Sequence, residues 1–323
     1  MLQIRVPARL HVTLIDLSKD GYRRNGGIGF SLQELHATLT FEKSNFVELS
    51  ALSIHGFSEP EIARLTSVLE QQKKLSGLSG IRLQRASFSN RHSGFGTGTA
   101  AAMACIEAFH LINAVELSPS EIIRLSGRGG ASGVGVHGYF SGGFIFDVGR
   151  AFDDSRLSSS DNVSSGFAPP TAFSRLNFPE WKIGVVQLPV DLIVPLVTEN
   201  LLFEKNLPLK DIDVHSTAYH SIFGTCAAVL ESNFASFCRS INNIQNCAWK
   251  NSEIELYGET VRKYMSRLRL LGCDAVGMSS VGPTMYFFAD DFLTVYQRIQ
   301  NEFPELVISS SWPSNVGRSV SYV

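Results

Sequence analysis

The segment from Ser93 to Thr99 reads Ser-Gly-Phe-Gly-Thr-Gly-Thr and is followed at once by an alanine-rich stretch that predicts a helix over 100–113. Glycines at alternate positions let successive backbone N–H groups turn toward one point, and the N-terminus of a helix adds positive potential there. The segment lacks the Gly-Lys-Ser/Thr of a Walker A loop and the spacing of a dinucleotide fingerprint. The alternative is a glycine-rich turn that only packs a helix against a strand. We predict a phosphate-binding loop formed by Ser93, Gly94, Gly96, Thr97, Gly98 and Thr99.

A second glycine-rich segment, 127–135, carries Arg128 together with Gly129, Gly130 and Ser132. An arginine beside several exposed amides suits an oxygen-rich anion, because a guanidinium binds phosphate through two parallel hydrogen bonds. The alternative is that the glycines only end one helix and begin a buried strand. His137 follows this segment and could act as an acid or base, although a single histidine in such a place is more often a packing or surface residue.

A third group of polar residues lies near the start of the chain. Asp16 comes seven positions after Arg9, so a regular strand would place the two side chains on opposite faces, and only a bulge or bend would bring them together. Arg23, Arg24 and Asn25 follow in a turn-rich segment, where the arginines could equally be solvated surface charges.

Composition limits the kinds of ligand these residues could bind. The chain has 323 residues, 44% hydrophobic and 18% charged, and its net charge is −2. These values predict a folded core, and they argue against nucleic acid or a membrane as partner, since both need a broad cationic surface. The first residues do not resemble a signal peptide, and the five cysteines are odd in number and lack C-x-x-C spacing. We expect a cytoplasmic protein with reduced cysteines.

The elements that must position these residues alternate between strands and helices. The first half predicts strands at 2–15, 38–49, 81–84 and 143–148, a polar loop at 20–27, and helices at 59–74, 100–113 and 118–127. A Ser-rich stretch at 153–170 predicts a connector. The second half predicts strands at 181–188, 275–278, 284–288 and 307–311, and helices at 213–230, 234–244, 252–271 and 291–302. This is an α+β layout.

Three motifs of the chain resemble those of the galactokinase, homoserine kinase, mevalonate kinase and phosphomevalonate kinase (GHMP) superfamily. They are Pro7-Ala8-Arg9, the loop from Gly94 to Thr99, and the segment from Gly277 to Thr284. The resemblance implies a two-domain α+β fold. Residues 1–170 would form a domain like the second domain of ribosomal protein S5, and residues 171–323 a ferredoxin-like domain.

Within this superfamily the chain is most similar to β-ribofuranosylaminobenzene 5′-phosphate synthase and related C-nucleoside synthases. The strings that carry the likeness include Leu14-Ile15-Asp16-Leu17, Asn25-Gly26-Gly27 and Gly127-Arg128-Gly129-Gly130. The resemblance implies that phosphoribosyl pyrophosphate reacts with an aromatic or heteroaromatic carboxylic acid, such as 4-aminobenzoate or 4-hydroxybenzoate, releasing diphosphate and carbon dioxide. The pathway would make a methanopterin-like cofactor or a C-nucleoside.

The same resemblance assigns roles to the candidate residues. It implies catalytic roles for Arg9, Asp16 and Arg128, and contacts with the acceptor or the 5′-phosphate for Arg24, Asn25, Ser280 and Thr284. It further implies Mg²⁺, no organic cofactor, and a homodimer. The ligands of the metal stay unassigned.

One departure separates the synthase from the kinase interpretation. Many kinases of the superfamily carry an aspartate in a Ser-Gly-x-Asp string, and the corresponding place in Ser132-Gly133-Val134-Gly135 is a glycine. A missing base lowers the rate of phosphoryl transfer without abolishing it, because that reaction depends mainly on positioning and electrostatics. An ATP-dependent small-molecule kinase therefore remains the alternative, and a non-catalytic ligand-binding relative is a third hypothesis.

Overall fold

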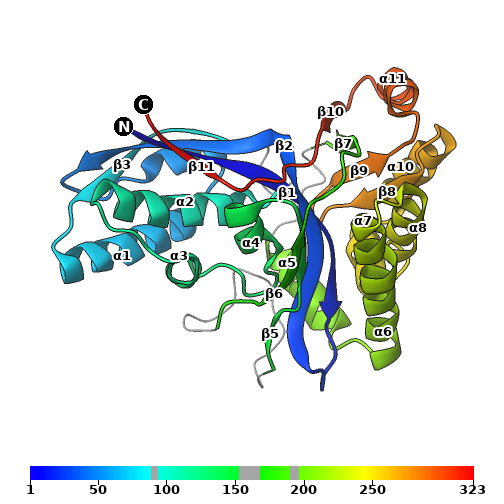
Figure 1. Ribbon diagram of the computed structural model, residues 1–323, viewed down its shortest axis with the longest axis horizontal. Coiled ribbons are helices and arrows are strands. Elements are labelled where there is room, and N and C mark those ends of the chain that lie inside the picture. The colour runs from blue at the N-terminus through cyan, green and yellow to red at the C-terminus, as the bar shows by residue number, and fades with distance from the viewer. Residues whose placement is uncertain (89–93, 153–167, 190–195) are drawn as a thin grey trace.

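The computed structural model describes residues 1–88, 94–152, 168–189 and 196–323. Ser93 and most of the predicted connector at 153–170 lie outside the described residues. The described residues form two antiparallel sheets with helices packed beside them (Figure 1).

The first sheet has the strand order β11-β1-β2-β4-β6, and β3 and β5 also pair with β2. Its strands are β1 (Leu2–Asp16), β2 (Arg23–Ser44), β3 (Gly80–Ser87), β4 (Phe144–Asp147), β5 (Arg150–Ala151), β6 (Ala172–Leu176) and β11 (Ser319–Tyr322). The second sheet has the order β10-β7-β9-β8 and consists of β7 (Ile183–Gln187), β8 (Ala275–Met278), β9 (Thr284–Phe288) and β10 (Val307–Ser311). Strands β6 and β11 follow residue 170 in the chain and nevertheless belong to the first sheet. The domain boundary expected at residue 170 therefore stays a prediction.

The helices fall into two groups along the chain. A 3₁₀ turn (Ser50–His55) and helices α1 (Glu59–Ser76), α2 (Thr97–Ile112), α3 (Pro119–Ser126) and α4 (Val134–Ser141) belong with the first sheet (Figure 1). The second group is α5 (Leu196–Asn206), α6 (Asp211–Tyr219), a π-helical stretch (His220–Cys226), α7 (Ala227–Leu230), α8 (Phe234–Ile244), α9 (Ala248–Glu255), α10 (Glu259–Leu270) and α11 (Phe292–Glu302).

Strand β1 is long enough to serve two cores. Leu2, Ile4 and Val6 pack with the apolar faces of α1, α2 and α3, whereas Leu10 and Val12 pack with the second sheet and α8. Phe178 connects the two sheets, with its ring stacked 4.8 Å from that of Phe30 and edge-on to Phe288. The polar residues that follow Val6 on β1 therefore lie where the helical layer and the second sheet meet.

Two sequence predictions are wrong in informative ways. The expected loop at 20–27 is short, because β2 already begins at Arg23 and runs buried between β1 and β4. Its glycines allow this close packing: a Cβ on Gly29 would lie 2.4 Å from the Leu10 carbonyl oxygen. The helix expected over 252–271 is two helices, α9 and α10, separated at Gly258, which has a φ of 54°. Ser252 lies inside α9 and caps nothing; its hydroxyl donates to the Ala248 carbonyl.

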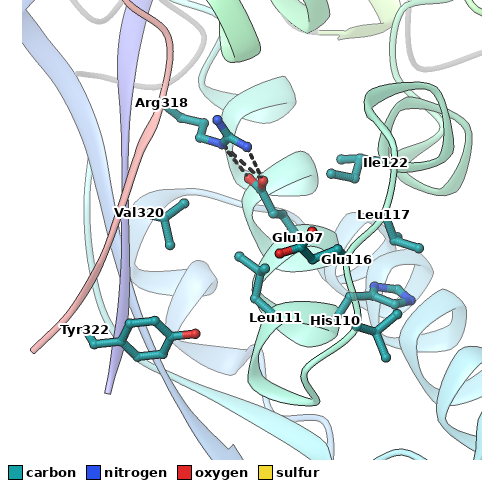
Figure 2. Close-up of a pocket in the computed structure, with 10 residues that line it drawn as sticks. Glu107, His110, Leu111, Glu116, Leu117, Ile122, Arg318, Val320 and Tyr322 are labelled. Atoms are coloured by element: carbon teal, nitrogen blue, oxygen red, sulfur yellow. Dashed lines mark hydrogen bonds and ion pairs between the residues drawn. The ribbon is translucent and has the colours of Figure 1, made fainter.

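The C-terminal strand is attached to α2 by an ion pair. Glu107 of α2 is buried and accepts from the Tyr139 hydroxyl at 2.6 Å, and the Arg318 guanidinium binds the same carboxylate at 2.6 to 3.1 Å. Glu107 and Arg318 border a cavity of about 430 Å³ between α2, α3 and β11 (Figure 2). The five cysteines are all buried, as expected of small packing residues. Among the described residues, no helix is both long and apolar enough to cross a membrane.

Candidate functional site

The glycine-rich loop ends in the first turn of α2. Gly94 and Gly96 have φ angles of 82° and 75°, which only glycine adopts without strain, and Gly96 is the N-cap of the helix. The helix begins at Thr97, three residues earlier than the sequence suggested, so Thr97, Gly98 and Thr99 form its first turn. Backbone N–H groups of this turn have no partner within the helix, and N–H groups so placed at a helix N-terminus can bind an anion.

Arg9 of β1 fixes the start of this loop. Its backbone N–H donates to the Phe95 carbonyl at 3.1 Å, and its Nη1 donates to the Gly94 carbonyl at 2.8 Å. Its Nε is buried and has no hydrogen-bond partner. Burial of the guanidinium, followed by repulsion from Arg128, lowers the pKa of Arg9 to about 10. Arg9 remains charged at neutral pH, beside a second cation.

Arg128 approaches the same helix end from the other side. Its Nε donates to the Thr99 hydroxyl at 3.3 Å, and a Cβ on Gly98 would lie 3.3 Å from its Nη2. Two arginines and the N-terminus of α2 therefore converge. Such an arrangement is destabilising by itself and suits a ligand with several negative oxygens.

The second glycine-rich segment is held by buried polar groups. The Asp147 carboxylate accepts hydrogen bonds from the backbone N–H groups of Gly133 and Gly149, the latter at 2.7 Å. Burial raises the pKa of Asp147 to about 6. Asn25 Nδ2 donates to the Gly130 carbonyl at 2.9 Å, so the segment is tied to β2. This glycine-rich segment is shorter than predicted, because α4 begins at Val134. His137 lies inside α4, with its Nε2 3.0 Å from the Pro170 carbonyl oxygen.

His11, to which the sequence motifs assign no role, lies between the two glycine-rich segments. Its Nε2 lies 3.1 Å from the Ser132 hydroxyl, which also accepts from the Val134 backbone N–H at 3.2 Å. Burial, and then repulsion from Arg9 and Lys250, hold the pKa of His11 well below its ordinary range. His11 is therefore neutral, and its Nε2 shares a hydrogen bond with the Ser132 hydroxyl.

Asp16 and Arg24 form a separate group at the far end of the β1–β2 hairpin. Two bulges interrupt β1, between Pro7 and Arg9 and between His11 and Thr13, but no described hydrogen bond or ion pair joins Asp16 to Arg9. Seven strand residues span roughly 23 Å. The Asp16 carboxylate instead accepts from the Ser18 hydroxyl at 2.7 Å and from backbone N–H groups of the hairpin.

Arg24 is buried close to this carboxylate. Its Nη1 donates to the carbonyls of Ser18 and Lys19 at 3.4 and 3.3 Å, and its guanidinium lies 4.2 Å from the centre of the Phe152 ring. In the ladder between β2 and β5 it stands directly opposite Arg150, which is also buried. Two arginines opposite one another make a second cationic group, which the Asn25–Gly130 hydrogen bond links to the Arg128 segment.

The turn after β8 touches the glycine-rich loop directly. The Ser279 hydroxyl donates to the Gly94 carbonyl at 2.7 Å and accepts from the His11 N–H at 3.0 Å, while the Ser280 N–H donates to the His11 carbonyl at 3.0 Å. Ser280 has a φ of 53°, unusual for a residue with a side chain. Thr284 is buried on β9, where its backbone carbonyl accepts from the Ser279 N–H and its hydroxyl has no hydrogen-bond partner.

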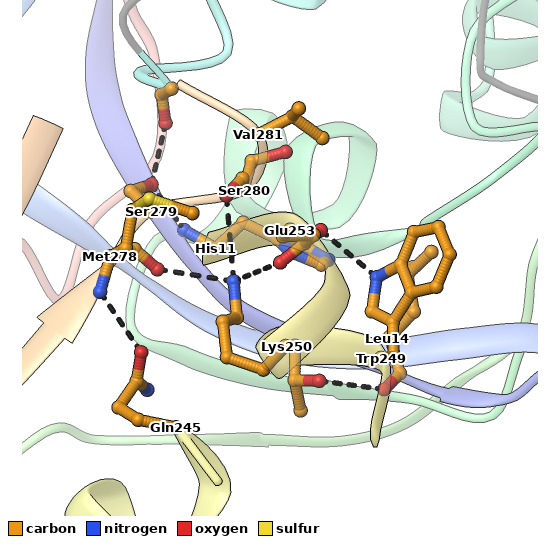
Figure 3. Close-up of polar contacts among 12 residues, drawn as sticks. His11, Leu14, Gln245, Trp249, Lys250, Glu253, Met278, Ser279, Ser280 and Val281 are labelled. Carbon is orange, nitrogen blue, oxygen red and sulfur yellow. Dashed lines mark hydrogen bonds and ion pairs between the residues drawn. The ribbon is translucent and has the colours of Figure 1, made fainter. Parts of the chain in front are cut away.

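A buried ion pair behind this turn also escaped the sequence analysis. Lys250 and Glu253 of α9 form an ion pair with side chains 0% and 2% exposed (Figure 3). A lysine and a glutamate three residues apart on a helix usually mark a solvated face, so only the packing reveals this pair. Among the described residues, no group of three or more His, Cys, Asp or Glu is arranged to hold a metal ion.

Comparison with known proteins agrees with the sequence motifs. No protein-family model matches the chain. The chain is 30% identical to the β-ribofuranosylphenol 5′-phosphate synthase of Archaeoglobus fulgidus, covering 90% of this chain and 88% of that one. It is 28% identical to the protein of the same name from Methanocaldococcus jannaschii, covering 98% and 99%.

Solved structures confirm the fold. Homoserine kinase from Cytophaga hutchinsonii superimposes with a TM-score of 0.65 at 14% identity over 99% of this chain and 97% of that one. Mevalonate pyrophosphate decarboxylase from Streptococcus pyogenes superimposes with a TM-score of 0.66 at 11% identity over 98% of each chain. The expected α+β fold of the GHMP kinases is confirmed, and on the strength of its archaeal relatives the chain belongs to the β-ribofuranosylphenol 5′-phosphate synthase family of enzymes.

Proposed function

We propose that this enzyme joins C1 of phosphoribosyl pyrophosphate to the ring carbon of an aromatic or heteroaromatic acid that bears the carboxylate. The names of its relatives support synthesis of a ribofuranosyl 5′-phosphate product. The observation that carries the proposal is the convergence of Arg9, Arg128 and the N-terminus of α2, a site for a polyanionic leaving group.

The chemistry balances without a protein base. The ring carbon attacks C1, the C1–O bond to diphosphate breaks, and loss of carbon dioxide returns the electrons of its C–C bond to the aromatic ring. No proton is transferred, which agrees with a site rich in cations and with a glycine at position 135. Negative charge grows on the diphosphate in the transition state, where Arg9, Arg128 and the amides of residues 97–99 would stabilise it.

We assign the second cationic group to the other anion, either the 5′-phosphate or the acceptor carboxylate. Arg24, Asn25 and Arg150 lie together at this end of β2. The Asp16 carboxylate accepts three hydrogen bonds within the hairpin, so we propose that it shapes the hairpin that carries Arg24. Ser280 and Thr284 belong to the turn that touches Gly94, so we propose that they support the loop. Mg²⁺ would take most of its ligands from phosphate oxygens and water.

The test is incubation of the protein with phosphoribosyl pyrophosphate, Mg²⁺ and 4-aminobenzoate or 4-hydroxybenzoate, with diphosphate and carbon dioxide measured together. Equal amounts of both support the proposal. Diphosphate without carbon dioxide would show hydrolysis only, and consumption of ATP with an alcohol would show a kinase. If both benzoates fail, a panel of heteroaromatic acids decides whether the acceptor or the reaction was misassigned.

A variant pair tests the role of the arginines. Arg128→Met is expected to lower kcat/KM for phosphoribosyl pyrophosphate by roughly 10² to 10³, the usual loss for one donor to a developing anion. Arg82→Met is the matched control, because Arg82 pairs with Glu42 and Glu48 on the exposed face of β3, away from the loop. Equal activity of the two variants would contradict the assignment.

A further inference from the structure

We propose that the buried Lys250–Glu253 pair positions the glycine-rich loop for anion binding, with Lys250 acting through the turn at Ser279 and Ser280. The Lys250 ammonium is surrounded by acceptors: the Met278 carbonyl at 3.1 Å, the Ser280 carbonyl at 3.5 Å and the Glu253 carboxylate (Figure 3). An ammonium has three N–H donors, so each proton has one acceptor. Lys250 thus holds both ends of a short backbone segment.

This segment adopts a conformation that needs support. Ser280 has a positive φ, which costs a residue with a side chain free energy unless its surroundings compensate. Around it, the Tyr257 hydroxyl donates to the Val281 carbonyl, and Gln245 Oε1 accepts from the Met278 N–H at 3.1 Å. Lys250 is the charged member of this set of contacts, and charge-assisted hydrogen bonds are the strong ones.

Two hydrogen bonds that share the Gly94 carbonyl connect the turn with Arg9. The Ser279 hydroxyl donates to the Gly94 carbonyl, which also accepts from Arg9 Nη1 at 2.8 Å. The fit is close, because a Cβ on Gly94 would lie 2.3 Å from the Ser279 carbonyl oxygen. A displacement of the turn would therefore shift Gly94 and the guanidinium of Arg9 together. Lys250 itself touches neither the loop nor Arg9 in any described contact, so it is a positioning residue.

Glu253 balances the charge of Lys250. Its carboxylate accepts from Trp249 Nε1 at 2.9 Å and is buried with Lys250 in the layer between β1 and α9. This partner supplies the opposite charge that a buried ammonium needs. Removal of one partner alone would leave an unpaired buried charge, which destabilises any fold and would hide a specific effect.

The test therefore uses the double variant Lys250→Met/Glu253→Gln. It removes both charges and leaves a side-chain oxygen for Trp249, so its melting temperature is expected to lie nearer the wild type than that of Lys250→Met. Its affinity for diphosphate alone, measured by calorimetry, is expected to fall at least tenfold.

Hydrogen exchange gives a readout that depends on no substrate. Amides of residues 94–100 are expected to exchange faster in the double variant, while those of α1, which lies in the helical layer of the first sheet, keep their wild-type rates. The proposal rests on the proposed function only for the identity of the anion, so faster exchange would stand even if the enzyme proved to be a kinase. A double variant with wild-type exchange in residues 94–100 and wild-type diphosphate affinity would overturn it.

Discussion

Gly96→Ala tests the anion site, because the added methyl group would strain the backbone at residue 96 and would also displace the Arg9 side chain. Gly96 has a φ of 75° at the N-cap of α2, and an added Cβ would lie 2.9 Å from Arg9 Nε and 3.0 Å from Arg9 Cγ. Real Cβ atoms do not approach other atoms so closely, so the Arg9 side chain must move. The helix itself has room to persist, because only the end of a flexible side chain is displaced.

Two separate losses are expected from this one methyl group. An alanine held in the left-handed region costs about 1–2 kcal/mol of folding free energy. Displacement of Arg9 also breaks its charged hydrogen bond to Gly94 and removes it from the anion, an interaction that contributes about 1.5–3 kcal/mol. The second loss corresponds to a roughly 10-fold to 150-fold weaker affinity for diphosphate.

Gly77→Ala is the matched control for the backbone term. Gly77 has a φ of 65° at the end of α1, and nothing lies within 4 Å of a Cβ placed there. Both variants should lose similar stability in urea titrations, whereas only Gly96→Ala should lose affinity in calorimetry with diphosphate. If Gly96→Ala binds diphosphate as tightly as Gly77→Ala does, Arg9 does not form part of the anion site.

Three further substitutions probe other parts of the structure. Gly135→Asp places a carboxylate beside Thr99, since a Cβ there lies 3.4 Å from its Cγ2, and it should weaken diphosphate binding at least tenfold in calorimetry without lowering stability. The folded pKa of Asp147, about 6 against an ordinary 3.8, means that the wild type should lose about 2 kcal/mol of stability as pH rises from 4 to 6; Asp147→Asn should flatten this slope in urea titrations. Arg318→Met leaves Glu107 buried without its cation and should cost about 2 kcal/mol in the same titrations, with kcat unchanged.

The last two predictions have simple counter-tests. Arg82→Met removes an exposed ion pair instead of a buried one and should cost less stability than Arg318→Met, so an equal loss in the two variants would contradict the argument from burial. A slope between pH 4 and 6 that survives Asp147→Asn would assign the proton uptake to another group.

The parts of the fold that the sequence predicted are those with a local signal. The box formed by Ser118 and Glu121, with Pro119 at the first helical position, fixed the start of α3, and both capping hydrogen bonds are present. The start of α2 was placed too late, because threonine and glycine have low helix propensity and the cap at Gly96 outweighs them. The first half of β2 was missed for a related reason, since this buried part of the strand is rich in glycine and arginine, whereas its second half overlaps the strand predicted at 38–49.

In the candidate site, too, the parts that could be predicted are those with a local signal in the sequence. The glycine-rich loop and the start of α2 are neighbours in sequence, whereas Arg128 lies 29 residues after Thr99 and reaches it through the fold. His11 could not be predicted, because its contact with Ser279 spans 268 residues. Lys250 could not be predicted either, because its contact with Met278 joins two different elements 28 residues apart. Asp16 could be placed on β1 from the sequence. Its position relative to Arg9 depends on where the two bulges interrupt the strand, and the alternation of side chains along the sequence does not show where bulges occur.

The pairing of β11 with β1 has a consequence for the order in which the molecule assembles. Leu2 pairs with Tyr322, whereas Asp16 pairs with Asn25 across one tight connection. In an unfolded chain, closing the longer loop costs about 3 kcal/mol more in chain entropy than closing the shorter one. The hairpin of β1 and β2 can therefore form early, while β11 docks only after the intervening chain has folded. The strand that Arg318 fastens to α2 is thus the last to join its sheet and the first expected to leave it.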